Sequence, residues 1–332
     1  MFEWFEKLTG FRELEIDTVP HFMELQGNKL FSKANGREWQ HGSLEITNLA
    51  ELRARLAAAA LPLGQLHVME VVVDVGDLHE YPANAGACFQ VSAQFNLLEM
   101  MYSIIPPELG ITRYEFDGTQ GHVSAVACAA GTLYRNYFVP LGDQLGQTRE
   151  RQINCLEAIG RYLGHKEQPL WEYENGYIIL SEEGLGRINS RLAILSPEER
   201  ERLKGLLDIG IHWDTEVTRS KKGHCVTQVF GTPLIIEDWQ AHPTAHLERF
   251  TRLVLEASYE ASLITGLLNA QRTGNPVVYL TLLGEGAYEK EGHWIIDALE
   301  GNLRRFQDYA LEVRVVSHGA PNPLVEGLLG DW

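Results

Sequence analysis

Short apolar runs alternate with segments of helical spacing along this chain, a pattern typical of α/β proteins. Five runs have the length and the Val, Ile and Leu content of strands: HVMEVVVDV (67–75), ACFQVSAQF (87–95), CVTQVF (225–230), PVVYLTLL (276–283) and LEVRVVS (311–317). We expect the first of them to be a buried strand because of its valines. Runs 87–95 and 276–283 are too apolar to leave a face in water, which predicts interior strands of a mixed central sheet in a three-layer α/β/α domain.

Helices and turns fill the intervals between these strands. Apolar residues at helical spacing predict helices at 152–164, 247–270 and 294–309. Turn and capping residues add local signals: a type I′ hairpin at Asn35-Gly36, a second hairpin at Asn175-Gly176, a helix cap at Asn48, and a capped helix start at Ser196-Pro197-Glu198-Glu199. Since no repeat or long linker divides the chain, we expect residues 1–62 to form a helix and hairpin extension packed on one domain of residues 63–332.

Composition limits the classes of function. The chain has 332 residues and a formal net charge of −17, which argues against a surface that coats nucleic acid. No apolar run approaches the roughly 18 residues of a membrane span, and the start MFEWFEKLTG lacks the apolar core of an export signal. The four cysteines are scattered without a CxxC pair, so we expect buried thiols in a reducing cytoplasm.

An open glycine turn follows the run 276–283. Gly284 and Gly286 flank one acidic residue, Tyr288 comes next, and Glu289 and Glu291 precede a helix. Glycines at the carboxyl end of a strand let the backbone approach a ligand, and the following helix presents free N–H groups that suit a phosphate. A tight turn without a ligand is the alternative. The segment is neither the dinucleotide motif GxGxxG nor a Walker phosphate loop.

A second candidate loop lies within residues 89–138. The run 87–95 leads into Gln94-Phe95-Asn96, and the acidic turn Asp117-Gly118-Thr119-Gln120-Gly121 precedes a helix of small residues. Each polar residue also has a structural interpretation. Asn96 could cap a helix, Asp117 could make an Asx turn with Gly118, and Thr119 and Gln120 could cap the helix of small residues.

The order of these motifs resembles the macrodomain fold. The similarity is carried by QFNLLE, YEFDGTQG, TLYRNYF, VTQVFGTPL, VLEASYEASL and YLTLLGEGAYEKEGHWI, over about residues 65–320. More narrowly, the chain resembles ADP-ribosyl hydrolases of the poly(ADP-ribose) glycohydrolase type, and most of all the arginine-directed macrodomain hydrolases of bacterial effectors. The first 60 residues lie outside the resemblance.

The resemblance implies roles for particular residues. Asn96 would hold the distal ribose, and the late loop would wrap the diphosphate through Gly284, Glu285, Gly286, Ala287 and Tyr288. The Gly-Gly-Gly run and paired glutamates of poly(ADP-ribose) glycohydrolases are missing, and DGTQG (117–121) stands in their place. The catalytic candidates are therefore Asp117, Glu289 and Glu291, with further ligand contacts from Gln94, Thr119, Gln120 and Gly121.

The implied activity is hydrolysis of the N-glycosidic bond between ADP-ribose and a protein side chain, with arginine as the favoured linkage. Carboxylates can stabilise the oxocarbenium-like transition state, and acidic residues can also bind a guanidinium leaving group. The expected partner is ADP-ribose or an ADP-ribosylated protein, without a membrane and without a cofactor. Two alternatives remain: an ADP-ribose reader without catalysis, and an enzyme that processes NAD or a nucleotide sugar.

Two other acidic segments have competing interpretations. Glu256 and Glu260 lie one helical turn apart, so Glu260 becomes a further ligand contact if their shared face meets the cleft, and means little if that face is solvated. The segment His212-Trp213-Asp214-Thr215-Glu216 resembles a metal cluster but is better explained as a strand of alternating polar residues. We therefore predict no metal site.

Overall fold

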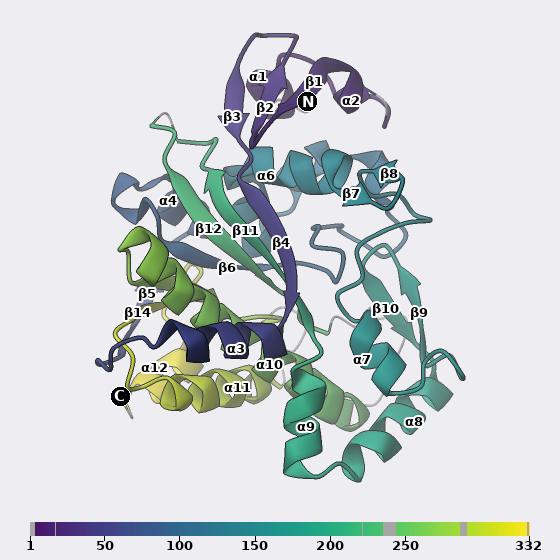
Figure 1. Cartoon of the computed structure of the whole chain (residues 1–332), viewed down its shortest axis with the longest axis vertical. Coiled ribbons are helices and arrows are strands. Elements are labelled where there is room, and N and C mark those ends of the chain that lie inside the picture. Colours follow the sequence, from purple (N-terminus) through teal and green to yellow (C-terminus); the bar gives the residue numbers. More distant parts are fainter. Residues whose placement is uncertain (1–3, 17, 221, 235–243, 286–290, 331) are drawn as a thin grey trace.

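A seven-stranded mixed sheet runs through the centre of the protein in the order β4-β11-β12-β6-β13-β14-β5 (Figure 1). The structure is a computed structural model that describes residues 4–16, 18–220, 222–234, 244–285, 291–330 and 332. The strands of this sheet are β4 (Ser43–Asn48), β5 (His67–Val72), β6 (Cys88–Ser92), β11 (Asp208–Glu216), β12 (Cys225–Gly231), β13 (Val277–Thr281) and β14 (Glu312–Ser317). β11 is antiparallel to both of its neighbours, whereas the pairs from β12 to β5 are all parallel.

Helices cover both faces of the sheet. The long helix α10 (Thr244–Thr273) packs against β12, β13 and β6, with α11 (Gly292–Arg305) beside it, while α5 (Gln120–Ala127) packs on β6 and α6 (Ala129–Leu133) on β11. Alternate residues of β13 enter different clusters: Val278 and Leu280 join the large core, and Val277 and Tyr279 join a smaller one. Both faces of β13 are therefore buried, which confirms an interior strand within three α/β/α layers.

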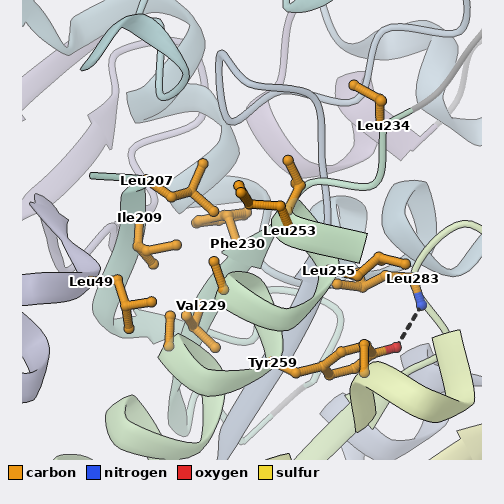
Figure 2. Close-up of a cluster of buried hydrophobic side chains, with 14 of the residues drawn as sticks. Leu49, Leu207, Ile209, Val229, Phe230, Leu234, Leu253, Leu255, Tyr259 and Leu283 are labelled. Atoms are coloured by element: carbon orange, nitrogen blue, oxygen red, sulfur yellow. Dashed lines mark hydrogen bonds between the residues drawn. The ribbon is translucent and has the colours of Figure 1, made fainter. Parts of the chain in front are cut away.

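The large core lies between α10 and the sheet (Figure 2). Leu253 and Tyr259 of α10 are fully buried among residues of several strands and helices, including Val229 of β12 and Ile209 of β11. The Tyr259 hydroxyl also accepts the N–H of Leu283 (3.0 Å) and donates to the carbonyl of Thr281 (3.0 Å). The core helix thus holds the turn that follows β13.

The remaining elements form smaller units around this sheet. They are α1 (Trp4–Thr9), α2 (Thr18–Phe22), β1 (Met23–Gln26), β2 (Lys29–Ser32), β3 (Glu38–Gln40), α3 (Leu49–Ala59), α4 (Val75–Glu80), η1 (Pro82–Asn84), η2 (Pro107–Leu109), η3 (Thr112–Phe116), the π-helix η4 (Tyr134–Phe138), β7 (Pro140–Leu141), β8 (Gln144–Leu145), α7 (Glu157–Tyr162), β9 (Trp171–Glu174), β10 (Tyr177–Leu180), α8 (Glu182–Ala193), α9 (Pro197–Lys204) and α12 (Pro323–Leu329). Within the described residues, no helix combines the length and the apolar character needed to cross a membrane.

Several local predictions are confirmed. Asn48 caps α3 by accepting the N–H of Glu51 (2.9 Å), and Ser196 forms the full capping box of α9 with Glu199. Asn175 (φ +48°) and Gly176 (φ +89°) form the turn of the β9–β10 hairpin with both residues left-handed, as a type I′ turn requires.

Other predictions need correction. β5 is an edge strand, and Met69 and Val72 are exposed, because its position in the strand order leaves one side without a partner. Asn35-Gly36 lies in a longer loop between β2 and β3, and of the two only Gly36 has a positive φ (+72°), so the turn is not type I′. The helix expected at 152–164 is limited to α7, and α11 ends at Arg305.

The first 62 residues contribute to two sheets. β1, β2 and β3 form a small sheet of their own, whereas β4 pairs with β11 in the central sheet and α3 packs on α10. The domain boundary near residue 62 stays a prediction.

Candidate functional site

A cavity of about 640 Å³ opens at the carboxyl ends of the parallel strands β6, β13 and β14. β6 and β13 pair only through Val278 with Cys88 and Tyr279 with Phe89. One step further, the side chain of Gln90 accepts the N–H of Thr281 (3.2 Å) in place of a backbone carbonyl. The end of backbone pairing between two central strands leaves room where open α/β sheets commonly bind ligands.

Three loops that the sequence analysis singled out line this one cavity. The loop after β6 contributes Gln94 and Glu99, the segment before α5 contributes residues 117–121, and the turn after β13 contributes Gly284 and Glu285. Because the loops come from distant parts of the chain, the fold alone brings these polar groups together.

Glu99 is the acidic residue that the sequence analysis missed. Its side chain lies in the wall of the cavity, and the residue is only 6% exposed. The backbone N–H of Glu99 donates to the hydroxyl of Tyr114 (2.9 Å), while Oε1 is buried without a hydrogen-bond partner among the described residues. Burial raises the pKa of Glu99 well above its usual range, the nearby Asp117 raises it further, and Arg135 opposes the shift. Burial in the cavity wall therefore favours the protonated form of Glu99.

His122 lies close to both Glu99 and Asp117. Its Nδ1 is 3.9 Å from Oε2 of Glu99, 3.5 Å from Oδ2 of Asp117 and 2.8 Å from Oγ1 of Thr119. Burial lowers the pKa of His122, against the opposing effect of Asp117, which favours a neutral ring. The two carboxyl groups thus lie near the same nitrogen of one imidazole, and they differ in environment because Asp117 is much more exposed than Glu99.

Gly121 allows this cluster to form. A Cβ atom at Gly121 would lie 2.6 Å from the carbonyl oxygen of Ser92 and 2.7 Å from Oε2 of Glu99. Only a residue without a side chain lets the first turn of α5 approach the end of β6 and the Glu99 carboxyl so closely.

Arg135 supports the loop that carries Glu99. It is fully buried, its Nε donates to the carbonyl of Leu97 (2.9 Å), and its guanidinium lies 4.3 Å from the ring centroid of Phe230. Burial lowers the pKa of Arg135 to about 10. Leu97 has φ +64°, a left-handed conformation that is rare for such a side chain. Arg135 therefore stabilises a strained residue two positions before Glu99.

We expect Glu99→Gln to be more stable than the wild type at pH 7. The raised pKa means that the folded state holds the Glu99 proton more tightly than the unfolded state, whose glutamate pKa is about 4.3. The stabilising contribution of neutral Glu99 is complete below that pH and is lost as the pH rises through the folded pKa. Thermal denaturation should show a higher Tm for Glu99→Gln at pH 7, with the difference gone near pH 4. The exposed Glu115→Gln is the control, and an unchanged Tm difference across the pH range would contradict the assignment.

The polar residues of the loop after β6 mostly form hydrogen bonds within the protein. Gln94 accepts the N–H of Met100 (2.7 Å) and donates to the hydroxyl of Tyr177 (3.2 Å), so it shapes the cavity wall that it lines. Asn96 is fully buried, accepts the N–H of Leu98 (3.1 Å) and donates to Gln152 (2.9 Å). Among the described residues Asn96 is not part of the cavity lining, and no helix follows it, so the geometry supports neither the ribose contact nor the helix cap.

The acidic turn combines structural contacts with cavity lining. Asp117 accepts the N–H of Thr119 (2.8 Å) through Oδ1, the Asx turn anticipated from the sequence, while Oδ2 faces His122. Thr119 occupies the N-cap position of α5 but makes no side-chain cap bond. The side chain of Gln120 accepts the N–H of Val75 (2.8 Å) and lies 3.2 Å from Nδ1 of His318. These two contacts connect the start of α4 and the end of β14 to the cavity wall.

The turn after β13 is described only in part. Gly284 has φ +83°, and Glu285 accepts the side-chain N–H of Asn322 (2.6 Å); both residues line the cavity. The predicted contacts of Gly286, Ala287, Tyr288 and Glu289 lie outside the described residues. Glu291 occupies the N-cap of α11, with Oε2 3.6 Å from Nδ1 of His293, and is not one of the described residues that line the cavity.

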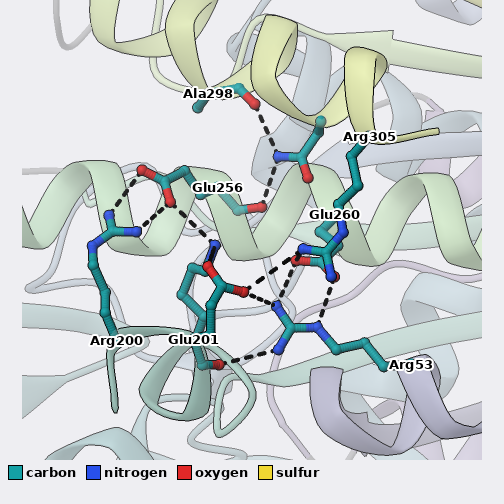
Figure 3. Close-up of polar contacts among 9 residues, drawn as sticks. Arg53, Arg200, Glu201, Glu256, Glu260, Ala298 and Arg305 are labelled. Atoms are coloured by element: carbon teal, nitrogen blue, oxygen red, sulfur yellow. Dashed lines mark hydrogen bonds and ion pairs between the residues drawn. The ribbon is translucent and has the colours of Figure 1, made fainter. Parts of the chain in front are cut away.

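Glu260 is not a cavity residue, which corrects its interpretation as a ligand contact (Figure 3). Its side chain is 1% exposed and lies between two guanidinium groups: Arg53 of α3, bound at 2.7 Å, and Arg305, at 3.0 Å. Glu256 binds Arg200 through both carboxylate oxygens (2.6 and 2.8 Å). The face of α10 that carries these two glutamates therefore contacts arginine side chains of other elements. It meets neither the cleft nor open solvent.

We expect Glu260→Gln to reduce the free energy of unfolding by about 2 kcal/mol, because Arg53 and Arg305 lose their buried partner and keep only the more exposed Glu201. Chemical denaturation measures this loss. Glu248→Gln on the same helix is the matched control: its ion pair with Arg252 is partly exposed, and the expected loss is below about 1 kcal/mol. Loss of ligand binding without loss of stability would restore Glu260 as a ligand contact.

The possible metal ligands and the thiols can be located in the described part of the chain. No group of three His, Cys, Asp or Glu residues there could hold a metal ion, and His212 to Glu216 lie in β11 as expected. All four cysteines are free, and three are buried, which agrees with the prediction of buried thiols.

The chain matches no protein-family model and no curated protein. Among solved structures, it is similar to poly(ADP-ribose) glycohydrolase from Thermomonospora curvata bound to the inhibitor ADP-HPD, with 12% identity, 96% of each chain covered and a TM-score of 0.44. It is also similar to poly(ADP-ribose) glycohydrolase from Deinococcus radiodurans in complex with ADP-ribose, with 9% identity, 86% of this chain and 91% of that chain covered, and a TM-score of 0.42. At such low identities and TM-scores, the similarity by itself assigns neither a family nor an activity to this chain.

Proposed function

We propose that this protein is a hydrolase that removes ADP-ribose from modified protein side chains, with ADP-ribosyl-arginine as the favoured substrate. One observation carries the proposal: two carboxyl groups in different environments, Glu99 and Asp117, both lie beside Nδ1 of His122 in the wall of one cavity. Glycosidic hydrolysis uses two carboxyl groups in different roles, one as a proton donor and one as a carboxylate.

The chemistry divides between the two acids. The neutral Glu99 donates its proton to the leaving nitrogen as the bond from that nitrogen to the ribose carbon breaks. The Asp117 carboxylate stabilises the positive charge that develops on the ribose and accepts a proton from the attacking water, whose oxygen forms the new bond to the same carbon. Free ADP-ribose and an unmodified side chain result, and each carboxyl group returns to its starting state by proton exchange with solvent.

The cavity suits a nucleotide ligand in size and in its backbone groups. Its volume of about 640 Å³ falls within the range of about 300–1,000 Å³ typical of small-molecule sites. The N-terminus of α5 and the glycine turn after β13 both border it, and such backbone can bind a diphosphate without lysine or arginine. The motif order noted in the sequence analysis is the reason for choosing ADP-ribose among nucleotides.

Arginine is the preferred linkage because the cavity is rich in acid. Besides Glu99, which acts as the neutral acid, Asp117 and Glu285 line it as carboxylate partners, and no lysine or arginine does so among the described residues. A guanidinium group binds carboxylates through paired hydrogen bonds, so the leaving side chain would be held as well as released.

Mass spectrometry after incubation with arginine-, glutamate- and serine-linked ADP-ribosyl peptides tests the function. We expect release of ADP-ribose from the arginine-linked peptide first. Release from another linkage alone would keep the hydrolase and reject its specificity. If calorimetry detects ADP-ribose binding but no peptide is cleaved, the protein is a reader. If NAD or a nucleotide sugar binds and ADP-ribose does not, the proposal fails.

A further inference from the structure

A second cavity, of about 340 Å³, lies on the same segment that carries both proposed catalytic acids. We propose that this second cavity binds the polypeptide of the ADP-ribosylated protein, through an apolar and a basic side chain near the modified residue. The inference rests on the proposed function and adds the surface that recognises the protein part of the substrate.

The second cavity is built between the N-terminal segment and the loop before η3. Glu13 accepts hydrogen bonds from the backbone N–H of Thr112 (2.6 Å) and from the hydroxyl of Tyr137 (2.6 Å), and the indole of Trp4 donates to the carbonyl of Thr112 (2.9 Å). These contacts fix both walls, so the cavity is present without a ligand. Phe5, Leu14 and Leu109 supply its apolar lining.

The two cavities are close enough for one polypeptide to reach both. The second cavity ends at Thr112 and Arg113, and the first begins at Asp117, with the helix η3 (Thr112–Phe116) between them. A 3₁₀-helix rises about 2 Å per residue, so the five residues of η3 separate the nearest lining residues of the two cavities by roughly 10 Å. About three residues of extended chain span that distance. A side chain three positions from the modified arginine can therefore enter the second cavity.

Exposed apolar side chains are concentrated on this segment. Within the described residues, fifteen large apolar side chains are exposed, and four of them lie in the short stretch 102–116: Tyr102, Ile104, Leu109 and Phe116. Leu14, which is 78% exposed, lines the second cavity with Leu109. Single exposed leucines are ordinary, but Leu14 and Leu109 both line the second cavity, and two exposed apolar side chains in one cavity suit a protein partner.

The charged residues that line the second cavity indicate which kind of partner it binds. Four glutamates and two arginines line the second cavity, and one of these arginines, Arg12, is already paired with Glu6 at 2.8 Å. The excess of acid favours a basic side chain, and the net charge of −17 disfavours nucleic acid. A polypeptide with basic and apolar residues around a modified arginine meets both conditions.

Steady-state kinetics with two substrates tests the proposal. One substrate is ADP-ribosyl-arginine, which cannot reach the second cavity. The other is a peptide that carries ADP-ribose on an arginine, with a leucine three positions to one side of that arginine and a lysine three positions to the other side. We expect Leu14→Ser combined with Leu109→Ser to raise the KM of the peptide about tenfold or more, since two apolar contacts are lost. The kcat for the peptide and both constants for ADP-ribosyl-arginine should stay unchanged. Glu15→Lys should also raise the KM of the peptide, through charge repulsion.

Leu63→Ser is the matched control, since Leu63 is 80% exposed and is not among the described residues that line either cavity. Equal constants for the wild type and the variants with both substrates would overturn the proposal, and so would an equal loss with both. If the wild type binds ADP-ribose without cleaving a substrate, calorimetry with the same variants replaces the kinetics. The variants should then bind the modified peptide more weakly than the wild type does and should bind ADP-ribose equally well. If ADP-ribose does not bind, the proposed function and this inference both fail.

Discussion

Asp117→Asn and Glu99→Gln should each lower the kcat for ADP-ribose release by about 10²–10⁴-fold, the usual contribution of general acid–base catalysis. Both substitutions keep the shape of the side chain. In the proposed mechanism, Glu99→Gln removes the transferable proton, and Asp117→Asn removes the negative charge that stabilises the ribose. Release of ADP-ribose from an arginine-linked peptide measures the loss, and calorimetry should show that each variant still binds ADP-ribose.

The control for both variants is Glu115→Gln, an exposed acid in the same segment, which should keep full turnover. If Asp117→Asn and Glu99→Gln are both fully active, the catalytic assignment is wrong, and Glu291 and Glu289 become the next candidates. If only Glu99→Gln is active, the leaving group takes its proton from another donor, and His122 is the nearest group to test.

Gly121→Ala should reduce turnover by about 10²-fold or more, although it adds a single methyl group. The new Cβ would lie 2.6 Å from the backbone oxygen of Ser92 and 2.7 Å from Glu99, so either α5 moves away from β6 or the Glu99 carboxyl turns away. Displacement of a catalytic group by about 1 Å can cost that much in rate.

Gly118→Ala makes the same chemical change three residues earlier in the same turn. A Cβ atom there meets nothing within 4 Å, so turnover should stay close to the wild-type value. Comparison of the two alanine variants separates close packing against Glu99 from a general need for flexible glycines in the turn. Equal losses in both variants would favour flexibility and contradict the packing explanation.

The elements that sequence alone predicted well are those whose cause is local. The capping box at Ser196 and the hairpin at Asn175-Gly176 depend on residues within a few positions of each other, and both occur as expected. The interior position of β13 follows from a run that is apolar on both faces. β5 has a similar composition, but its exposure depends on where the sheet ends, which its own residues do not encode.

The acidic residues of the site also differ in whether the cause of their position is local or distant in the sequence. Asp117 was a candidate because its glycines and its place before a helix are visible in the sequence. Glu99 stands alone in the apolar run Leu-Leu-Glu-Met-Met, and a charge in such a run was the one available signal. Its environment comes from Arg135, Gly121 and Asp117, all on other elements. Glu260 was misinterpreted for the converse reason, since its partners Arg53 and Arg305 lie far away in the chain.

The two edges of the central sheet have a consequence for synthesis on the ribosome. Both edge strands, β4 and β5, belong to the first quarter of the chain, but β4 pairs with β11 and β5 pairs with β14, which begins at residue 312. At about 5–20 residues per second, β5 waits roughly 10–50 s for its partner to be translated. During that interval its unpaired backbone and its valines are open to other nascent chains. We therefore expect truncation before β14 to yield aggregates that chaperones retain, even though most of the cavity-lining residues have already been made.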